Sequence, residues 1–385
     1  MTRPTVTLAA AALALMALVA CSSTSKSKKA DKPVELVKFS AQFQPVRAWS
    51  VNLGKAEPKL RLGLSPAIDG NRVYGANPRG DVVALDLANG RQVWQRHFKL
   101  ALSGGPGAGN GLVLICGSGG TVVALAAADG AERWRVELNS ELLAAPVVTS
   151  DLVVARTVDG KLYGLEAADG HQRWVADQQV PRLTLRGTSR PVIAGEFAIS
   201  GFDNGRLMAV TLTSGTTAWD VAVGQPRGSS ELQRLIDIDS PVALDGDDLF
   251  AVAFQGRAVR LARDSGREIW SHEISSYRGL AADALGVYVS TAAGTVTRLD
   301  RASGAERWQQ QGLLRRSLTA PVLQGKRVVV ADFQGFIHWL SMDDGSFQAR
   351  AKGGARITSA PQVAGDLVVV QTDKGAIEAW RAPGN

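Results

Sequence analysis

The sequence has few cysteines, histidines and aromatic residues for a chain of 385 residues. It contains two Cys and four His, and 6% of its residues are aromatic. No Cys-x-x-Cys pair and no His/Cys set with metal-ligand spacing occurs, which argues against a zinc site or a redox dithiol. The four histidines are scattered, at His97, His171, His272 and His338. The sequence therefore predicts no bound metal and no nucleophile–base catalysis.

Sustained helical periodicity and a strong charge on the body of the chain are also missing. The chain is 45% hydrophobic with 41 Gly and 15 Pro, a globular composition rich in turn residues. The formal net charge is +7, but six basic and two acidic side chains lie in residues 1–38, which leaves +3 for the remainder. A nucleic-acid-binding surface needs a basic stripe with interleaved aromatics. We therefore expect no nucleic-acid partner.

The two cysteines have separate explanations. Cys116 ends an apolar run that starts at Leu112, and is expected to be a buried free thiol. Cys21 directly follows the apolar run 6–20, which comes after Arg3 and is too short to span a membrane comfortably. This arrangement is typical of a secretory signal peptide.

The end of that run is similar to the bacterial lipobox, because Cys21 is followed at once by a Ser/Thr-rich stretch. The resemblance implies cleavage before Cys21 and a lipid on its thiol. Ser22 in place of Asp implies sorting to the outer membrane. An ordinary secretory signal with a chance cysteine is the alternative. We expect a signal peptide at 1–20, and a lipidated Cys with a flexible tether at 21–44, because residues 22–38 are rich in Ser and Lys and poor in aromatics.

An internal repeat of about 40 residues covers the rest of the chain. Each copy begins with a glycine, and a pair of residues that is usually apolar starts four residues after it. In the first seven copies a second glycine stands ten residues after the first. In six of those copies a Trp stands fourteen residues after the first glycine. The first glycines are Gly80, Gly120, Gly160, Gly205, Gly256, Gly294, Gly335 and Gly375, and the tryptophans are Trp94, Trp134, Trp174, Trp219, Trp270 and Trp308. Ala349 takes the place of the seventh Trp and should weaken one junction.

The third copy shows what one unit builds. Short apolar segments at 145–149, 152–157, 161–166 and 172–175 are separated by turn residues, and Asp159-Gly160 provides the positive φ of a tight hairpin. Four short antiparallel strands in about 40 residues are typical of a propeller blade. The repeated Trp is expected to fill the wedge between blades, not to stack on a cofactor.

The two ends of the repeat region complement each other. The region opens on a lone fourth strand at 46–51 and ends after a third strand at 376–380. Pairing them would close the ring and remove its free edges. The sequence therefore predicts an all-β fold, an eight-bladed β-propeller of four-stranded antiparallel blades over residues 45–385.

Two adjacent connections are longer than the others, between Trp174 and Pro191 and between Trp219 and Pro241. Both join the fourth strand of one blade to the first strand of the next, so they emerge on one face of the ring. Insertions in repeat proteins often mark the binding face. From the residues alone, two interpretations stay open: exposed binding loops, or leucines that pack on the propeller and aspartates that cap turns.

The motif Ala-Leu-Asp-x-x-x-Gly-x-x-x-Trp, complete from Ala84 to Trp94, resembles the PQQ-type propeller repeat. With the lipobox, the tether and segments 183–187 and 234–239, the chain resembles the BamB family, lipoprotein subunits of the outer-membrane β-barrel assembly (BAM) complex. The resemblance implies a non-catalytic scaffold without cofactor, lipid-anchored at the outer membrane with its propeller in the periplasm. It implies that BamA binds, through its POTRA domains, to Leu183, Leu185, Arg186, Asp237 and Asp239. Nascent outer-membrane β-barrel proteins are a further expected partner, through β-augmentation at the blade edges.

Two other functions share parts of this pattern. A quinoprotein dehydrogenase has the same repeat, but such enzymes are much longer and need a Ca²⁺ site and insertions that close the cofactor pocket. An envelope scaffold with a different partner would keep the repeat and the lipobox, but would have no reason to keep both inserted segments.

Overall fold

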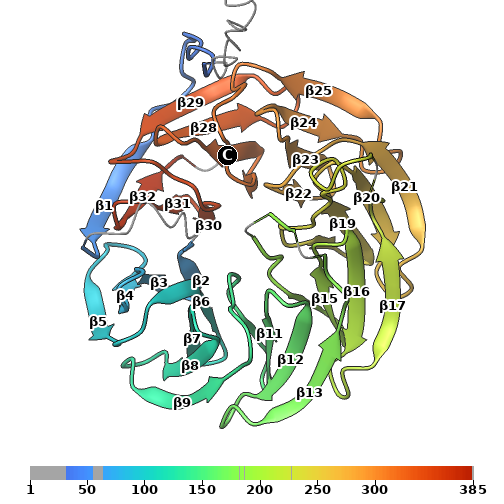
Figure 1. The fold of residues 1–385 in the computed structure, drawn as a ribbon. Coiled ribbons are helices and arrows are strands. Elements are labelled where there is room, and N and C mark those ends of the chain that lie inside the picture. The colour runs from blue at the N-terminus through green and yellow to red at the C-terminus, as the bar shows by residue number, and fades with distance from the viewer. Residues whose placement is uncertain (1–31, 55–63, 182, 186, 227, 384–385) are drawn as a thin grey trace, which may run out of the picture. The chain divides into compact units, whose positions relative to one another are not determined.

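The computed structural model describes residues 32–54, 64–181, 183–185, 187–226 and 228–383. Within these ranges the chain forms 32 β-strands and no helix. Accordingly, the described part contains no helix that could cross a membrane. The strands form eight antiparallel sheets of four strands, which follow one another around a ring (Figure 1). The predicted eight-bladed propeller is confirmed.

Each of blades 1–7 consists of four consecutive strands. Blade 1 is β2 (Ala67–Asp69), β3 (Arg72–Ala76), β4 (Asp81–Asp86) and β5 (Gln92–His97); blade 2 is β6 (Leu102–Gly109), β7 (Leu112–Gly117), β8 (Thr121–Ala126) and β9 (Glu132–Glu137). Blade 3 is β10 (Val147–Val148), β11 (Leu152–Arg156), β12 (Lys161–Glu166) and β13 (Gln172–Asp177); blade 4 is β14 (Val192–Ala194), β15 (Phe197–Gly201), β16 (Arg206–Thr211) and β17 (Thr217–Ala222). Blade 5 is β18 (Ala243–Asp245), β19 (Asp248–Val252), β20 (Arg257–Ala262) and β21 (Glu268–Glu273); blade 6 is β22 (Leu280–Ala282), β23 (Val287–Ser290), β24 (Val296–Leu299) and β25 (Glu306–Gln310). Blade 7 is β26 (Val322–Gln324), β27 (Arg327–Ala331), β28 (Phe336–Ser341) and β29 (Phe347–Lys352).

Blade 8 is built from both ends of the chain. Its strands β30 (Gln362–Ala364), β31 (Leu367–Gln371) and β32 (Ala376–Arg381) are completed by β1 (Val46–Asn52). β1 pairs antiparallel with β32, from Val46 opposite Arg381 to Asn52 opposite Ala376. The expected closure by terminal strands is therefore confirmed, with strand ends within about two residues of the prediction.

The repeated Trp and Gly of successive copies touch each other across the blade junctions. Trp134 on β9 donates its indole N–H to the carbonyl of Ala167 in the next blade, at 2.8 Å. Its ring covers Gly170, where a Cβ would lie 2.6 Å from the indole, and Gly170 also has a positive φ of 77°. The same pairing recurs for Trp49, Trp94, Trp174, Trp219, Trp270 and Trp308. The wedge-filling role predicted for the Trp is therefore confirmed, and it depends on glycine in the following blade.

The missing seventh Trp has a structural reason. Blade 8 has no turn between its third and fourth strands, because β1 supplies the fourth strand from the other end of the chain. A Trp in place of Ala349 would have no following glycine to cover. Instead, Phe43 packs edge-on against Trp339, with ring centroids 6.1 Å apart, in a cluster that includes Ala349. The junction expected to be weak is thus filled from the N-terminal segment.

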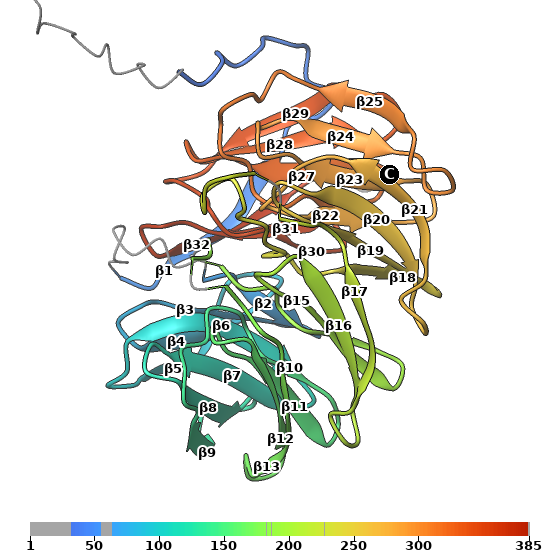
Figure 2. The same ribbon diagram turned by 45° about the vertical axis from the view of Figure 1, so that its right-hand side comes forward.

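Residues 34–43, which we call the strap, run along the outer edge of blade 7 ahead of β1 (Figures 1 and 2). The carbonyls of Val34 and Val37 accept hydrogen bonds from Arg316 and Arg350, both at 3.1 Å. Phe39 stacks on Phe347 at 5.4 Å. The expected tether, 21–44, therefore includes a stretch that packs on the propeller, whereas its first residues and Cys21 lie outside the described residues.

Candidate partner-binding site

The connections of the ring gather at two ends. Antiparallel alternation puts the loops between blades and the turns between second and third strands at one end, which we call the loop face. The other turns lie at the opposite end, the turn face. The two long connections are on the loop face: the first insertion is 178–191, between β13 and β14, and the second is 223–242, between β17 and β18.

The first insertion contains one exposed leucine and one whose backbone N–H is hydrogen-bonded to the second insertion. Leu183 is 45% exposed, and Leu185 is half-buried. The backbone N–H of Leu185 donates to Oδ2 of Asp237 at 2.7 Å. Arg186 lies outside the described residues. The structure thus brings together Leu185 and Asp237, two of the predicted site residues, which lie in different insertions and are 52 residues apart in the sequence.

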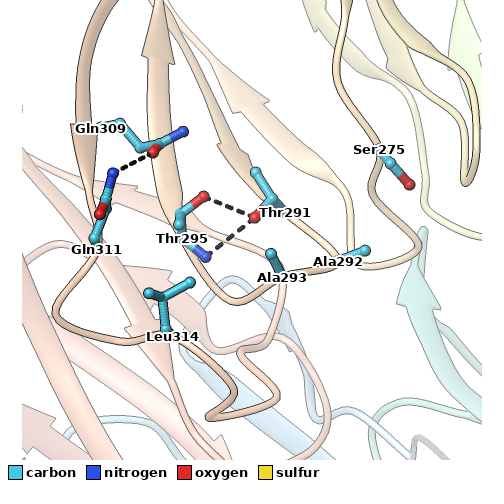
Figure 3. Close-up of a pocket in the computed structure, with 8 residues that line it drawn as sticks. All are labelled: Ser275, Thr291, Ala292, Ala293, Thr295, Gln309, Gln311 and Leu314. Carbon is cyan, nitrogen blue, oxygen red and sulfur yellow. Dashed lines mark hydrogen bonds between the residues drawn. The ribbon is translucent and has the colours of Figure 1, made fainter. Parts of the chain in front are cut away.

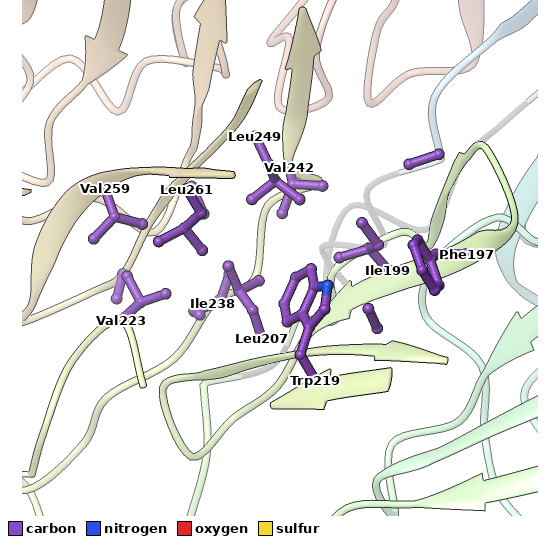
Figure 4. Close-up of a cluster of buried hydrophobic side chains, with 14 of the residues drawn as sticks. Phe197, Ile199, Leu207, Trp219, Val223, Ile238, Val242, Leu249, Val259 and Leu261 are labelled. Carbon is purple, nitrogen blue, oxygen red and sulfur yellow. The ribbon is translucent and has the colours of Figure 1, made fainter. Parts of the chain in front are cut away.

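The second insertion is anchored in the hydrophobic core. Ile236 and Ile238 are 2% and 0% exposed, and Ile238 lies among the buried side chains between blades 4 and 5 (Figure 4). The alternation of the segment then places Asp237 beneath the first insertion, fully buried. Asp239 packs against Gly187 so closely that a Cβ there would lie 2.8 Å from the carboxyl group. Both aspartates therefore support the first insertion from within.

Burial dominates the electrostatics of this carboxylate pair. Loss of solvent raises the pKa of Asp237 to about 6, although the Leu185 N–H stabilises its charged form. Burial, reinforced by the neighbouring charges of Asp237 and Asp203, raises the pKa of Asp239 to about 7. One oxygen of each carboxyl group has no hydrogen-bond donor among the described residues. The pair consequently changes its charge close to neutral pH.

This shift predicts a pH dependence of stability. A raised carboxyl pKa means that the folded state holds its protons more tightly than the unfolded state, so the free energy of unfolding falls as pH rises from about 4 to 7. We expect the double variant Asp237→Asn, Asp239→Asn to lose at least about 3 kcal/mol of this pH dependence, because the pKa of Asp237 alone is raised from 3.8 to about 6, at 1.36 kcal/mol per pKa unit. Urea unfolding across this pH range measures it. Equal slopes for both proteins would contradict the assignment.

Two features of the site were not predicted from sequence. Arg156 and Asp203, both buried, form an ion pair at 2.8 Å whose charges also act on the aspartates. Leu232, in the second insertion, is 68% exposed. A lone apolar residue in an otherwise polar stretch was the available signal for Leu232. Nothing in the sequence pairs Arg156 with Asp203, which come from different blades.

Two other residues with potentially reactive side chains, His338 and Cys116, are buried and have structural roles. His338 is buried between Asp332, at 3.2 Å, and Arg350, which donates to its Nδ1 at 3.1 Å. Cys116 is a buried free thiol whose pKa is raised by burial, as expected. Within the described residues, no group of three or more His, Cys, Asp or Glu is placed to hold a metal.

A polar depression lies near blade 6 on the loop face, and several of the polar side chains that line it are hydrogen-bonded to one another (Figure 3). The hydroxyls of Thr291 and Thr295 lie 2.7 Å apart, and Gln311 donates to Gln309 at 2.9 Å. Because these side chains bond to one another, the depression does not compete with the two insertions as a candidate site.

Comparison with known proteins decides the family. The family model described as outer membrane protein assembly factor BamB matches residues 46–101 and 79–310. The chain belongs to the BamB family. The BamB of Pseudomonas aeruginosa is 47% identical over 360 residues, which cover 93% of this chain and 94% of the relative. The crystal structure of BamB from Moraxella catarrhalis matches with a TM-score of 0.81 at 27% identity, and covers 88% of this chain and 100% of that one.

The enzyme alternative shares only the fold. The quinohemoprotein alcohol dehydrogenase of Comamonas testosteroni matches with a TM-score of 0.69 at 13% identity, over 89% of this chain and 77% of that one. The BamB family is described as an assembly factor and not as an enzyme. The prediction of a non-catalytic chain is therefore confirmed at the level of the family.

Proposed function

We propose that this protein is a scaffold for outer-membrane protein assembly, which binds the POTRA domains of BamA through the two insertions on the loop face. Family membership supports the role in assembly. The observation that carries the choice of site is an exposed Leu183 on a loop whose Leu185 N–H is held by a buried carboxylate. An apolar anchor held in a fixed loop loses little entropy on binding.

The buried aspartates act in this proposal as positioning residues. Asp237 is fully buried and accepts the Leu185 N–H, so it orders the loop instead of touching the partner. Leu183 and Leu185 would supply the apolar contact, and Arg186 would set orientation and association rate. The exposed Leu232 is a candidate for a second apolar contact on the same face.

The lipid anchor belongs to the same proposal. Cys21 would carry the lipid and hold the protein at the periplasmic side of the outer membrane. With its propeller kept beside the membrane, the protein would hold the periplasmic domains of BamA in a working arrangement. Labelling with a radioactive fatty acid, with Cys21→Ser as the control, tests this part.

A titration tests the site. We expect Leu183→Ala, Leu185→Ala and Arg186→Ala each to weaken binding to the purified periplasmic region of BamA by about 10- to 30-fold, as expected for interface anchors. Leu285→Ala removes an equally exposed leucine, 52% accessible, on the turn face, and is the matched control. Undiminished affinity in all three variants, with normal unfolding curves, would remove the two insertions as the binding site.

A further inference from the structure

The basic side chains of the loop face are concentrated on one side of the ring. From the loop between blades 6 and 7 around to the loop after blade 1, exposed basic residues occupy five of the described turns and loops, and the blade 7 turn at 332–335 carries none. We call this group the basic sector: Arg315, Lys352, Arg356, Lys374, Arg79 and Lys99. The strap adds no net charge to this group, because its exposed Lys38 is balanced by its exposed Glu35.

Acidic residues in the same region are few and mostly engaged. Asp332 and Glu378 are buried, with 0% and 1% exposure, and Asp373 lies 3.4 Å from Arg356. Blades 2–5 differ, because exposed acids stand on the loop face there: Glu137, Asp159, Asp177, Glu231 and Glu273. The small net charge of the body therefore hides a strong local excess of positive charge on blades 7, 8 and 1.

The basic sector lacks the apolar anchors of a protein interface. Among the described residues, the large apolar side chains that are exposed lie elsewhere, except for Val37 of the strap. Protein interfaces depend on buried aromatic or aliphatic anchors, whereas a membrane surface attracts through its charged headgroups. A broad polar surface with one sign of charge fits the second kind of partner.

We propose that the basic sector binds the anionic phospholipid headgroups of a membrane surface. The strap supports this orientation, because its first hydrogen bond joins Val34 N to Leu314 O in the loop beside Arg315. The strap therefore begins at the edge of the basic sector. The insertions lie on blades 3–5 of the same face, so membrane contact and partner contact use different residues.

Vesicle sedimentation tests the proposal with the chain that begins at Ser22. We expect it to bind vesicles of equal parts phosphatidylglycerol and phosphatidylcholine, and not vesicles of phosphatidylcholine alone. The triple variant Lys99→Glu, Arg356→Glu, Lys374→Glu should bind the anionic vesicles about 100-fold more weakly, since each basic residue near such a surface contributes about fivefold. Added salt should weaken wild-type binding steeply.

The matched control is Arg91→Glu, Arg133→Glu, Arg267→Glu, which makes the same change of charge at exposed positions of the turn face. It keeps the Lys-rich tether and should bind anionic vesicles like the wild type. Equal losses in both triple variants would overturn the proposal, because only net charge would then matter. A basic-sector variant that keeps vesicle binding but loses affinity for the BamA periplasmic region would overturn it as well, in favour of a protein surface.

Discussion

A chain that begins at Val46 is expected to unfold about 5–10 °C below a chain that begins at Pro33. The shorter chain keeps β1 and every blade strand, so only the strap is lost. Removal of the strap uncovers apolar surface on blade 7, where Leu36, Phe39 and Phe43 each lie half-buried. With about 1 kcal/mol for each half-buried side chain, the loss is about 3 kcal/mol.

Cation–π contacts and backbone hydrogen bonds add to this loss. The guanidinium of Arg350 lies 5.0 Å from the ring centroid of Phe39, and that of Arg327 lies 4.3 Å from the ring centroid of Phe43. Such contacts contribute about 0.5–1 kcal/mol each at partly exposed sites.

Thermal unfolding of the two chains by circular dichroism measures the effect. Phe39→Ala and Phe43→Ala in the longer chain separate the contributions of blade 7's two sides, and Val175→Ala, at an exposed apolar position on β13, is the control. Identical melting temperatures of the two chains would show that the strap does not stabilise the ring.

Asp237→Ala is expected to lower affinity for the BamA periplasmic region by 100-fold or more, a larger loss than for Leu183→Ala or Leu185→Ala. The reason is that one substitution releases the whole first insertion: the Leu185 N–H loses its acceptor, and a cavity opens beneath the loop. Both leucines then lose their fixed positions, so that binding must also order the loop.

The isosteric variant distinguishes this role from direct contact. Asp237→Asn keeps an oxygen that can accept the Leu185 N–H while it removes the charge, and should retain most of the affinity. If the carboxylate met a cation of the partner instead, Asn and Ala would weaken binding to a similar degree. Exchange of the Leu185 amide hydrogen, slow in the wild type and in Asp237→Asn but fast in Asp237→Ala, provides a readout that does not depend on binding.

The blades and their closure could be predicted because they depend on local and periodic signals. Asp159-Gly160 specifies a hairpin by itself, and a lone strand at 46–51 has one complementary partner at 376–380. The Gly–Trp pairing depends on two positions of one motif, although the contact is between successive copies. The repeat therefore identified the Gly and Trp positions as structural, but it did not show that each Trp covers the Gly of the following copy.

The carboxylates and the strap show where sequence reasoning stops. Whether Asp237 faces solvent or the interior depends on how Ile236 and Ile238 enter the junction of blades 4 and 5, a matter of packing across distant strands. Residues 34–43 are richer in apolar side chains than the Ser/Lys-rich stretch before them, but they lie outside the repeat, and Phe39 and Phe43 find partners about 300 residues away. Such long-range contacts leave no local pattern in the chain.

The position of the strap ahead of β1 determines how the ring responds to mechanical force. A pull on the N-terminal segment reaches Val34 first, where the load is shared with blade 7 through Arg316 and Arg350. β1, whose pairing with β32 closes the ring, is strained only after the strap has peeled away. The pairing at which the propeller would open is therefore shielded from tension applied through the strap.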